Sequence, residues 1–541
     1  MRHSPPSSAD PLAGRSTAAR LRAQLGHPLP AVVTAGGDLA SFTLGPDVAA
    51  LAVPIAPAAD GETEVQPRTG TADAAARYGI DLGELAERAG LTGTPGEAWT
   101  LQLPRRLVTT GPELPWGTLP PRLILVGVGQ GSPAELRRAG AALARQTPGL
   151  GRVVSTVGSE GGPRRREAVR ALVEGYLLAS YRIPTQATGT PAKLAADKLV
   201  LLGLDGAGDR AAILDATVAA RATWLVRDLT NTPSNTKNPA WLAQQAGELA
   251  AAAGLDVQVL GVPELRAQGF GGILAVGSGS ASEPRLVTVS YTPTDGRTGT
   301  HVVVVGKGIT FDTGGISIKP RQSMLAMKTD MAGSAVALAA VLAAAEKGLG
   351  HRVTAVLPLA ENHFGGASYR PSDVVTMYGG RTVEVSNTDA EGRMVLADAL
   401  AYADAELEPD VLIDVATLTA AASVGLGTQH AALFCADAAL AAGLEQAAAA
   451  SGEPLWRLPL VEEYLGAIGS AIADLRQSPL VSPGGGSITA ALFLREFTGR
   501  RRWAHLDIAG PARAASDRHE ITEGATGYGA RLLLRFLEEL S

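Results

Sequence analysis

Apolar positions in the second half of the chain fall into short runs that predict strands separated by helices. Runs rich in Val, Leu and Ile are typical of strands buried on both faces. They predict strands at residues 257–260, 272–276, 286–291, 302–305, 353–357, 411–415, 432–435 and 504–508. Longer alanine-rich and leucine-rich stretches predict helices at residues 239–253, 331–347, 394–404, 440–450 and 528–537. This alternation predicts a mostly parallel mixed sheet that is covered by helices on both faces.

The first part of the chain has a similar α/β rhythm. Its pattern predicts strands at residues 122–128 and 198–203 and helices at residues 133–145, 164–181 and 209–227. The turn-forming run Asn231-Thr-Pro-Ser-Asn-Thr-Lys-Asn-Pro is the strongest boundary signal. A chain of 541 residues exceeds one ordinary core. We therefore predict an α/β protein with a flexible tail (1–30), a smaller N-terminal α/β domain (31–207), a linker helix (208–230) and a larger C-terminal α/β domain (231–541).

Composition and charge narrow the functional classes. The net charge of −6 gives no electrostatic reason to expect a nucleic-acid partner. A single cysteine, Cys435, excludes an intrachain disulfide and a cysteine-based zinc site. Together with an N-terminus that lacks an apolar leader, it predicts a cytoplasmic location. The longest apolar stretch, residues 331–345, is interrupted by Gly333 and Ser334 and is expected to be too short to span a membrane.

Candidate chemistry is concentrated in two short segments. The first is Val305-Gly-Lys-Gly-Ile-Thr-Phe-Asp-Thr-Gly-Gly-Ile-Ser-Ile-Lys-Pro, which continues to Lys328-Thr-Asp, and the second is Asn387-Thr-Asp-Ala-Glu-Gly-Arg. Together they supply four carboxylates, two candidate lysines and an arginine: Asp312, Asp330, Asp389, Glu391, Lys307, Lys319 and Arg393. Four carboxylates carry about the charge that two divalent cations cancel, and hard oxygen ligands suit such ions.

Each of these residues also has a purely structural interpretation. Lys307 fits a surface lysine in a Gly-Lys-Gly turn, and Asp312 fits an aspartate in a turn. Asp330 fits the N-cap of the next helix, and Thr388-x-x-Glu391 matches a capping box. Taken jointly, the residues favour a metal site, because Asp389 and Glu391, two apart in an expected extended segment, would project to one side.

Other catalytic plans are poorly supported by the sequence. It contains no Gly-x-Ser-x-Gly elbow and no His-Glu-x-x-His motif. Cys435 lies inside a predicted buried strand. His505 is interpreted as a core histidine, or as one that contacts a site residue without itself contacting the ligand.

The two segments resemble the signature regions of the leucyl aminopeptidase (cytosol aminopeptidase) family of two-metal peptidases. The resemblance extends over residues 231–537 and includes Ala275-Val-Gly-Ser-Gly-Ser, Ala416-Thr-Leu-Thr, Trp456-Arg-Leu-Pro and His505-Leu-Asp-Ile-Ala-Gly. The N-terminal part is similar only in its α/β rhythm, which in that family forms a macro-like domain. The resemblance implies a cytoplasmic homohexamer that removes N-terminal residues, preferably Leu and other apolar residues, from peptides.

The same resemblance assigns roles to individual residues. It implies that Lys307, Asp312, Asp330, Asp389 and Glu391 bind two divalent metal ions, Mn²⁺ or Zn²⁺, with Asp312 and Glu391 bridging them. Lys319 would be the electrophilic lysine, and Arg393 would hold a bicarbonate that shuttles protons. Met327, Thr417 and Leu418 match substrate-binding positions. His363-Phe364 and Ala420 depart from the family pattern, and both departures bear on side-chain preference.

Three alternatives to a peptidase stay open at this point. A different two-metal hydrolase, such as a phosphoesterase, would use a similar set of ligands. A nucleic-acid-binding or scaffold role is disfavoured by the net acidity and by the lack of a basic, aromatic-rich patch. An inactive relative of the family is disfavoured because every ligand position is filled.

Overall fold

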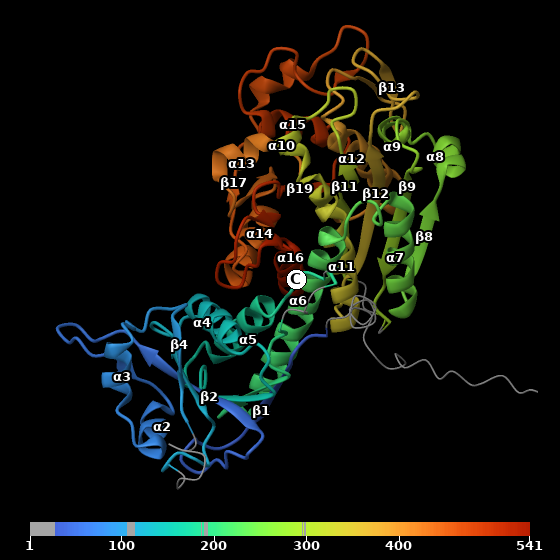
Figure 1. Ribbon diagram of the computed structural model, residues 1–541. Coiled ribbons are helices and arrows are strands. Elements are labelled where there is room, and N and C mark those ends of the chain that lie inside the picture. Colours follow the sequence, from blue (N-terminus) through green and yellow to red (C-terminus); the bar gives the residue numbers. More distant parts are fainter. Residues whose placement is uncertain are drawn as a thin grey trace, which may run out of the picture.

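Two α/β units joined by the long helix α6 (Ala207–Asn231) make up the protein (Figure 1). The computed structural model describes residues 28–104, 114–184, 187–188, 193–294, 296 and 299–540. The two-unit α/β architecture confirms the fold class expected from the sequence. The predicted tail, residues 1–30, lies outside the described residues except for its last three. The exact domain bounds stay a prediction.

The N-terminal unit is built on a seven-stranded sheet with the order β1-β7-β6-β2-β5-β4, with β3 paired to β2. All of these pairs are parallel except β3 with β2 and β4 with β5. The strands are β1 (Ala31–Ala35), β2 (Val48–Ala56), β3 (Gln66–Pro67), β4 (Ala98–Gln102), β5 (Arg122–Gly127), β6 (Arg152–Ser155) and β7 (Lys198–Leu202). The helices are α2 (Thr71–Tyr78), α3 (Leu82–Arg88), α4 (Pro133–Gln146) and α5 (Arg165–Ala179).

The larger unit is built on a nine-stranded mixed sheet with the order β17-β16-β19-β15-β10-β12-β9-β8, with β11 paired to β12. Its centre, β19-β15-β10-β12, is parallel, so the carboxyl ends of these strands meet at one edge. The strands are β8 (Asp256–Leu260), β9 (Arg285–Tyr291), β10 (His301–Gly306), β11 (Gly308–Asp312), β12 (Arg352–Asn362), β15 (Val411–Ala416), β16 (Ala431–Cys435), β17 (Leu455–Arg457) and β19 (Arg502–Asp507).

Helices cover both faces of this sheet, as the sequence predicted (Figure 1). They are α7 (Pro239–Ala252), α8 (Val262–Gln268), α9 (Gly271–Gly277), α10 (Arg321–Met324), α11 (Ala332–Lys347), α12 (Glu391–Tyr402), α13 (Ala420–Leu426), α14 (Ala438–Ser451), α15 (Gly486–Arg495) and α16 (Ala530–Glu539). Helices α7, α11, α14 and α16 pack on one face, and α9, α12 and α15 pack on the other.

One predicted strand is wrong. Residues 272–276 form part of helix α9, not a strand. A short apolar run fits either structure by periodicity alone. A side chain at Gly271 would overlap the Thr376 carbonyl, and one at Gly272 would overlap the Met394 carbonyl. The two glycines therefore let α9 pack directly against its neighbours, which a strand pattern does not anticipate.

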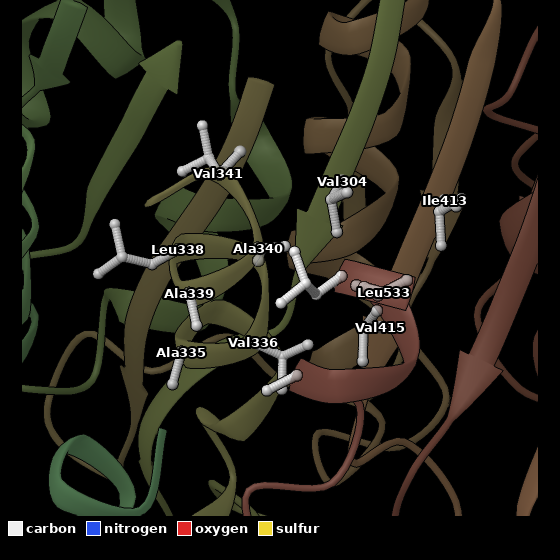
Figure 2. Close-up of a cluster of buried hydrophobic side chains, with 14 of the residues drawn as sticks. Val304, Ala335, Val336, Leu338, Ala339, Ala340, Val341, Ile413, Val415 and Leu533 are labelled. Carbon is white, nitrogen blue, oxygen red and sulfur yellow. The ribbon is translucent and has the colours of Figure 1, made fainter. Parts of the chain in front are cut away.

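Helix α11 is buried along most of its length at the centre of the larger core. Figure 2 shows its Val336 and Ala340 on the side of α11 that faces the sheet and α16, near Val304 and Leu533, with Leu338 on the opposite side of the helix. The helical run Met327–Lys347 is long and apolar enough to cross a membrane by length and composition, but 89 % of its most apolar window is buried inside the protein. The apolar stretch 331–345 that the sequence singled out is only part of this run, and its burial is that of a core helix.

Truncating this core helix should destabilise the protein strongly. Leu338 is 0 % exposed, so Leu338→Ala should lower the free energy of unfolding by about 2–5 kcal/mol, because it removes buried contacts and leaves a cavity. The matched control is Leu214→Ala on α6, where the leucine is 62 % exposed and the change should stay within about 0.5 kcal/mol. Urea unfolding followed by circular dichroism compares the two, and equal losses would contradict this assignment of the core.

Candidate metal site

Lys307 lies where strand β10 ends, against the first turn of helix α11. The Lys307 amide donates to the Val415 carbonyl at 3.0 Å, and the Ser334 amide donates to the Lys307 carbonyl at 2.9 Å. A side chain at Gly333 would overlap the Val415 carbonyl, so glycine is what lets α11 start this close to the sheet. Lys307 is 3 % exposed, and its interpretation as a surface lysine is therefore wrong.

The Lys307 ammonium contacts two of the candidate carboxylates. Its Nζ lies 2.9 Å from Asp330 Oδ1 and 2.8 Å from Glu391 Oε1. It also donates to the Thr417 carbonyl at 3.0 Å. The Lys307 side chain passes directly over Gly392, where an added Cβ would overlap its Cε. Glycine at this position in the first turn of α12 therefore leaves room for the lysine, and a larger residue would displace the end of its side chain.

Three carboxylates converge at this edge of the sheet. Asp312 ends strand β11, Asp330 follows the short turn η1 (Met327–Thr329), and Glu391 is the first residue of α12. One oxygen of each lies within 4.8 Å of the others, and all three residues are buried. In the part of the chain that the structure describes, Asp330 Oδ2 and Glu391 Oε2 are buried without a hydrogen-bond partner. Buried unpaired acceptors are costly, and a hard divalent cation would satisfy them.

Asp389 and Lys319 complete the cluster on the side of Asp312. Lys319 Nζ lies 2.8 Å from Asp312 Oδ2 and 2.5 Å from Asp389 Oδ1. Gly314 and Gly315 adopt left-handed conformations, with φ of 86° and 64°. This conformation suits glycine, and the turn returns the chain so that the Lys319 amide donates to the Thr313 carbonyl.

The local geometry around Asp389 differs from the one expected. The two acids do not lie in an extended segment, because Asp389 occupies a turn and Glu391 begins a helix. Both nevertheless face a lysine: Asp389 contacts Lys319, and Glu391 contacts Lys307.

The structural alternatives for the acidic residues are mostly wrong. The N-caps of α11 and α12 are Met331 and Ala390, and neither makes a side-chain capping bond among the described residues. The Thr388 hydroxyl donates to the Gly314 carbonyl, so Thr388 and Glu391 form no capping box. Only the turn interpretation of Asp312 is supported, since its Oδ1 accepts from the Gly314 amide at 2.8 Å.

Burial and mutual charge shift the pKa values of these groups in opposite directions. Burial raises the pKa of Asp330 to about 8 and that of Asp312 to about 6. For Glu391, burial would raise the pKa, but Lys307 and Lys319 lower it below its ordinary value. Burial would lower the pKa of Lys307, but Asp330 and Glu391 raise it. The acids and ammonium groups therefore compensate one another within a single buried cluster.

The remaining predicted residues surround the carboxylates. The Thr417 hydroxyl donates to Asp330 Oδ1 at 2.7 Å, and the Leu418 amide donates to Asp507 Oδ1 at 3.1 Å. Met327 begins η1 and is half-buried. Arg393 is 7 % exposed, with Nη1 donating to the Gln477 carbonyl at 2.8 Å. No hydrogen bond between Arg393 and the four acids is seen in the described residues.

Sequence reasoning gave Asn362 no role in the site. Its amide group donates to Asp312 Oδ1 at 2.8 Å and to the Thr388 carbonyl at 3.0 Å, and it is fully buried. Its position at the end of β12, on the edge where ligands of α/β sheets gather, was the available signal. Asn362 thus fixes the orientation of one candidate ligand.

The residues to which the sequence gave no metal-binding or catalytic role lie in the core or at the surface. His505 is fully buried with Nδ1 2.5 Å from Asp414 Oδ1, which confirms the core interpretation. Cys435 ends buried strand β16. Phe364 is 48 % exposed and stacks with His363, and Ala420 is the exposed first residue of α13.

Comparison with known proteins extends over both units. Residues 224–534 match the catalytic domain of the cytosol aminopeptidase family. A probable cytosol aminopeptidase of Roseiflexus castenholzii is 45 % identical over 438 residues, which is 79 % of this chain and 88 % of that protein. One from Leifsonia xyli is 44 % identical over 441 residues, covering 79 % of this chain and 87 % of that protein.

Solved structures give the same result. The bottromycin maturation enzyme BotP in complex with Mn is 34 % identical, with a TM-score of 0.78 over 91 % of this chain and 99 % of that one. A mutant of tomato leucine aminopeptidase is 28 % identical, with a TM-score of 0.82 over 95 % of this chain and 97 % of that one. The chain therefore belongs to the cytosol aminopeptidase family, a family of metal-dependent peptidases that act at peptide N-termini.

Proposed function

We propose that this protein is a leucyl aminopeptidase that uses two divalent cations per subunit to release Leu and other apolar residues from peptide N-termini. The observation that carries this proposal is the convergence of Asp312, Asp330 and Glu391 within 4.8 Å, with unpaired buried oxygens. Asp389 and Lys307 complete the proposed ligand set. Mn²⁺ is our first choice of ion because the similar BotP structure is described as a complex with Mn, and Zn²⁺ also accepts carboxylate ligands.

The two lysines have different roles in this proposal. When bound, the cations polarise the substrate carbonyl and lower the pKa of the attacking water. Lys307 binds a cation only as a neutral amine, so metal binding must displace its proton. Lys319 stays protonated, because Asp312 and Glu391 raise its pKa although burial alone would lower it. Its ammonium then stabilises the oxyanion that forms as the peptide carbonyl is attacked.

The substrate contacts come from the turn η1 and from the loop after β15. Met327 would contact the substrate side chain, and Thr417 and Leu418 its main chain. The 417–419 loop is held in place by Asp507, which accepts from the amides of Leu418 and Thr419 and from the Thr419 hydroxyl. Such fixed geometry is what positioning a substrate requires.

Arg393 is the proposed holder of a bicarbonate that shuttles protons. Its guanidinium is buried, and its Nε has no hydrogen-bond partner in the described chain. Burial lowers the pKa of Arg393 to about 10, so the group is still cationic at neutral pH. A buried cation with an unpaired donor is suited to a small anion.

Assembly as a homohexamer and a cytoplasmic location are part of the same proposal. Strongly exposed apolar side chains support subunit contacts; they include Val424, Leu480 and Val481, at 87 %, 67 % and 85 % exposed. The domain bounds 31–207, 208–230 and 231–541 are proposed with it, and so is a peptide rather than a nucleic-acid partner.

The proposed activity can be tested by removing and restoring the metal. Purified protein treated exhaustively with a chelator should lose hydrolysis of leucine p-nitroanilide, and Mn²⁺ or Zn²⁺ added separately should restore it. p-Nitrophenyl phosphate serves as the parallel substrate. Release from the phosphate ester alone would instead indicate a phosphoesterase, and no activity with any ion in folded protein would contradict both.

Replacing Lys319 should separate catalysis from metal binding. Lys319→Met should reduce kcat about 10²–10³-fold, the usual cost of losing an oxyanion donor, while Mn²⁺ still binds. Lys198→Met, at an exposed position in β7, is the control and should keep full turnover. Steady-state kinetics and calorimetric Mn²⁺ titration provide the two measurements. Near-normal kcat in Lys319→Met would refute the assigned role.

Filling the space beside Lys307 should weaken metal binding. Gly392→Ala places a methyl group against the Lys307 stem, so the Mn²⁺ dissociation constant should rise by about tenfold or more. Gly247→Ala on α7 meets no atom within 4 Å and should instead stabilise the helix by about 1 kcal/mol. Unchanged Mn²⁺ affinity in Gly392→Ala would show that Lys307 takes no part in binding the ion.

A further inference from the structure

Lys237 is a fully buried lysine in the turn between α6 and α7. It is 0 % exposed, and its Nζ donates to two main-chain carbonyls, those of Thr230 at 2.9 Å and Lys328 at 2.6 Å. Burial lowers the pKa of Lys237 well below its ordinary value, and the charge of Lys328 lowers it further. The buried lysines of the candidate site face carboxylates, whereas the described hydrogen bonds of Lys237 go to the backbone.

A second lysine makes the reciprocal connection. Lys328 Nζ donates to the Asn231 carbonyl at 2.8 Å. Two reciprocal hydrogen bonds therefore join residues 230–238 to η1. Lys237 of the first segment donates to a carbonyl of η1, and Lys328 of η1 donates to a carbonyl of the first segment. Lys328 directly follows Met327 and lies two residues before Asp330, and the Asp330 amide donates to the Met327 carbonyl at 3.3 Å. The Lys328 carbonyl therefore belongs to the short turn that carries both Met327 and Asp330.

The same turn holds a second ligand-bearing element and is itself anchored. The Ser234 hydroxyl donates to the Thr310 carbonyl at 2.9 Å, on the strand that ends with Asp312. The Asn231 amide group donates to the Tyr181 hydroxyl at 3.3 Å, and its oxygen accepts from the Ala525 amide at 3.0 Å. The turn is therefore bonded to both units and to the segments that carry two of the proposed metal ligands.

We propose that Lys237 is a positioning residue for the metal site, which it serves by fixing η1 through the Lys328 carbonyl so that Asp330 and Met327 are held in place. This inference rests on the proposed function, since it takes Asp330 as a metal ligand. A lysine suits this position because its long aliphatic side chain places one small amino group where it can donate to both carbonyls. The planar fork of arginine demands a different arrangement of acceptors. A residue without a donor leaves two carbonyls unpaired in the interior.

The inference can be tested with Lys237→Met, which keeps the stem and removes the donor. Calorimetric titration of chelator-treated protein with Mn²⁺ should show at least one dissociation constant raised about tenfold or more, as for other residues that support metal ligands. The KM for leucine p-nitroanilide should rise as well, because Met327 loses its fixed position. Wild-type Mn²⁺ affinity in a folded Lys237→Met variant would overturn the inference.

The control is Lys347→Met, which removes a lysine paired with Asp215 and Glu538 at the other end of α11. It should lower the melting temperature and leave Mn²⁺ affinity unchanged, which separates positioning from general destabilisation. If Lys237→Met does not fold, Lys328→Met breaks the reciprocal bond from a half-buried lysine and should weaken Mn²⁺ binding in the same direction. Unchanged affinity there would equally overturn the inference. Wild-type protein that binds no metal would refute the proposed function itself.

Discussion

The burial of three carboxylates at one edge of a sheet, beside the half-buried Asp389, is the constraint on which the rest of the site depends. Buried acids are stable only when their charge is compensated. Here Lys307 and Lys319 each contact two of the four acids. Two of the acids keep an oxygen without a protein partner in the described chain. The protein thus compensates this charge only in part and leaves acceptors that a further cation can satisfy, which is a physical basis for metal dependence.

The carboxylates and lysines can meet because β10, α11 and α12 approach one another closely. At Gly306, Gly333 and Gly392, any added side chain would overlap a neighbour. These glycines bring β10, α11 and α12 near enough for residues from three distant parts of the chain to meet. The surrounding core holds α11 buried between the sheet and neighbouring helices. Ligands on rigid elements keep their geometry more accurately than ligands on mobile loops.

The parallel sheet and the cluster of site residues could be predicted because each produces a recognisable pattern in neighbouring residues. The predictions from sequence were wrong or incomplete where contacts between distant parts of the chain determine the structure. Residues 272–276 became a helix because their glycines allow tight packing, and strand β2 was missed although it lies at the centre of its sheet, where Pro54 argues against a strand. Asn362 and Lys237 were missed because their roles depend on hydrogen bonds to residues far away in sequence.

The connection between the two units gives the N-terminal part a physical link to the site. Helix α6 starts in the smaller unit and ends at Asn231, where the turn holding η1 and β11 begins. Near its end, Arg227 donates to the Leu178 carbonyl of the smaller unit and to the Thr526 carbonyl of the larger one, both at less than 3 Å. Hydrogen bonds therefore connect the smaller unit, through α6 and the turn after it, to the segment that carries Asp330. The N-terminal unit is thus connected, through α6 and the turn that follows it, to the segments that carry two of the proposed metal ligands.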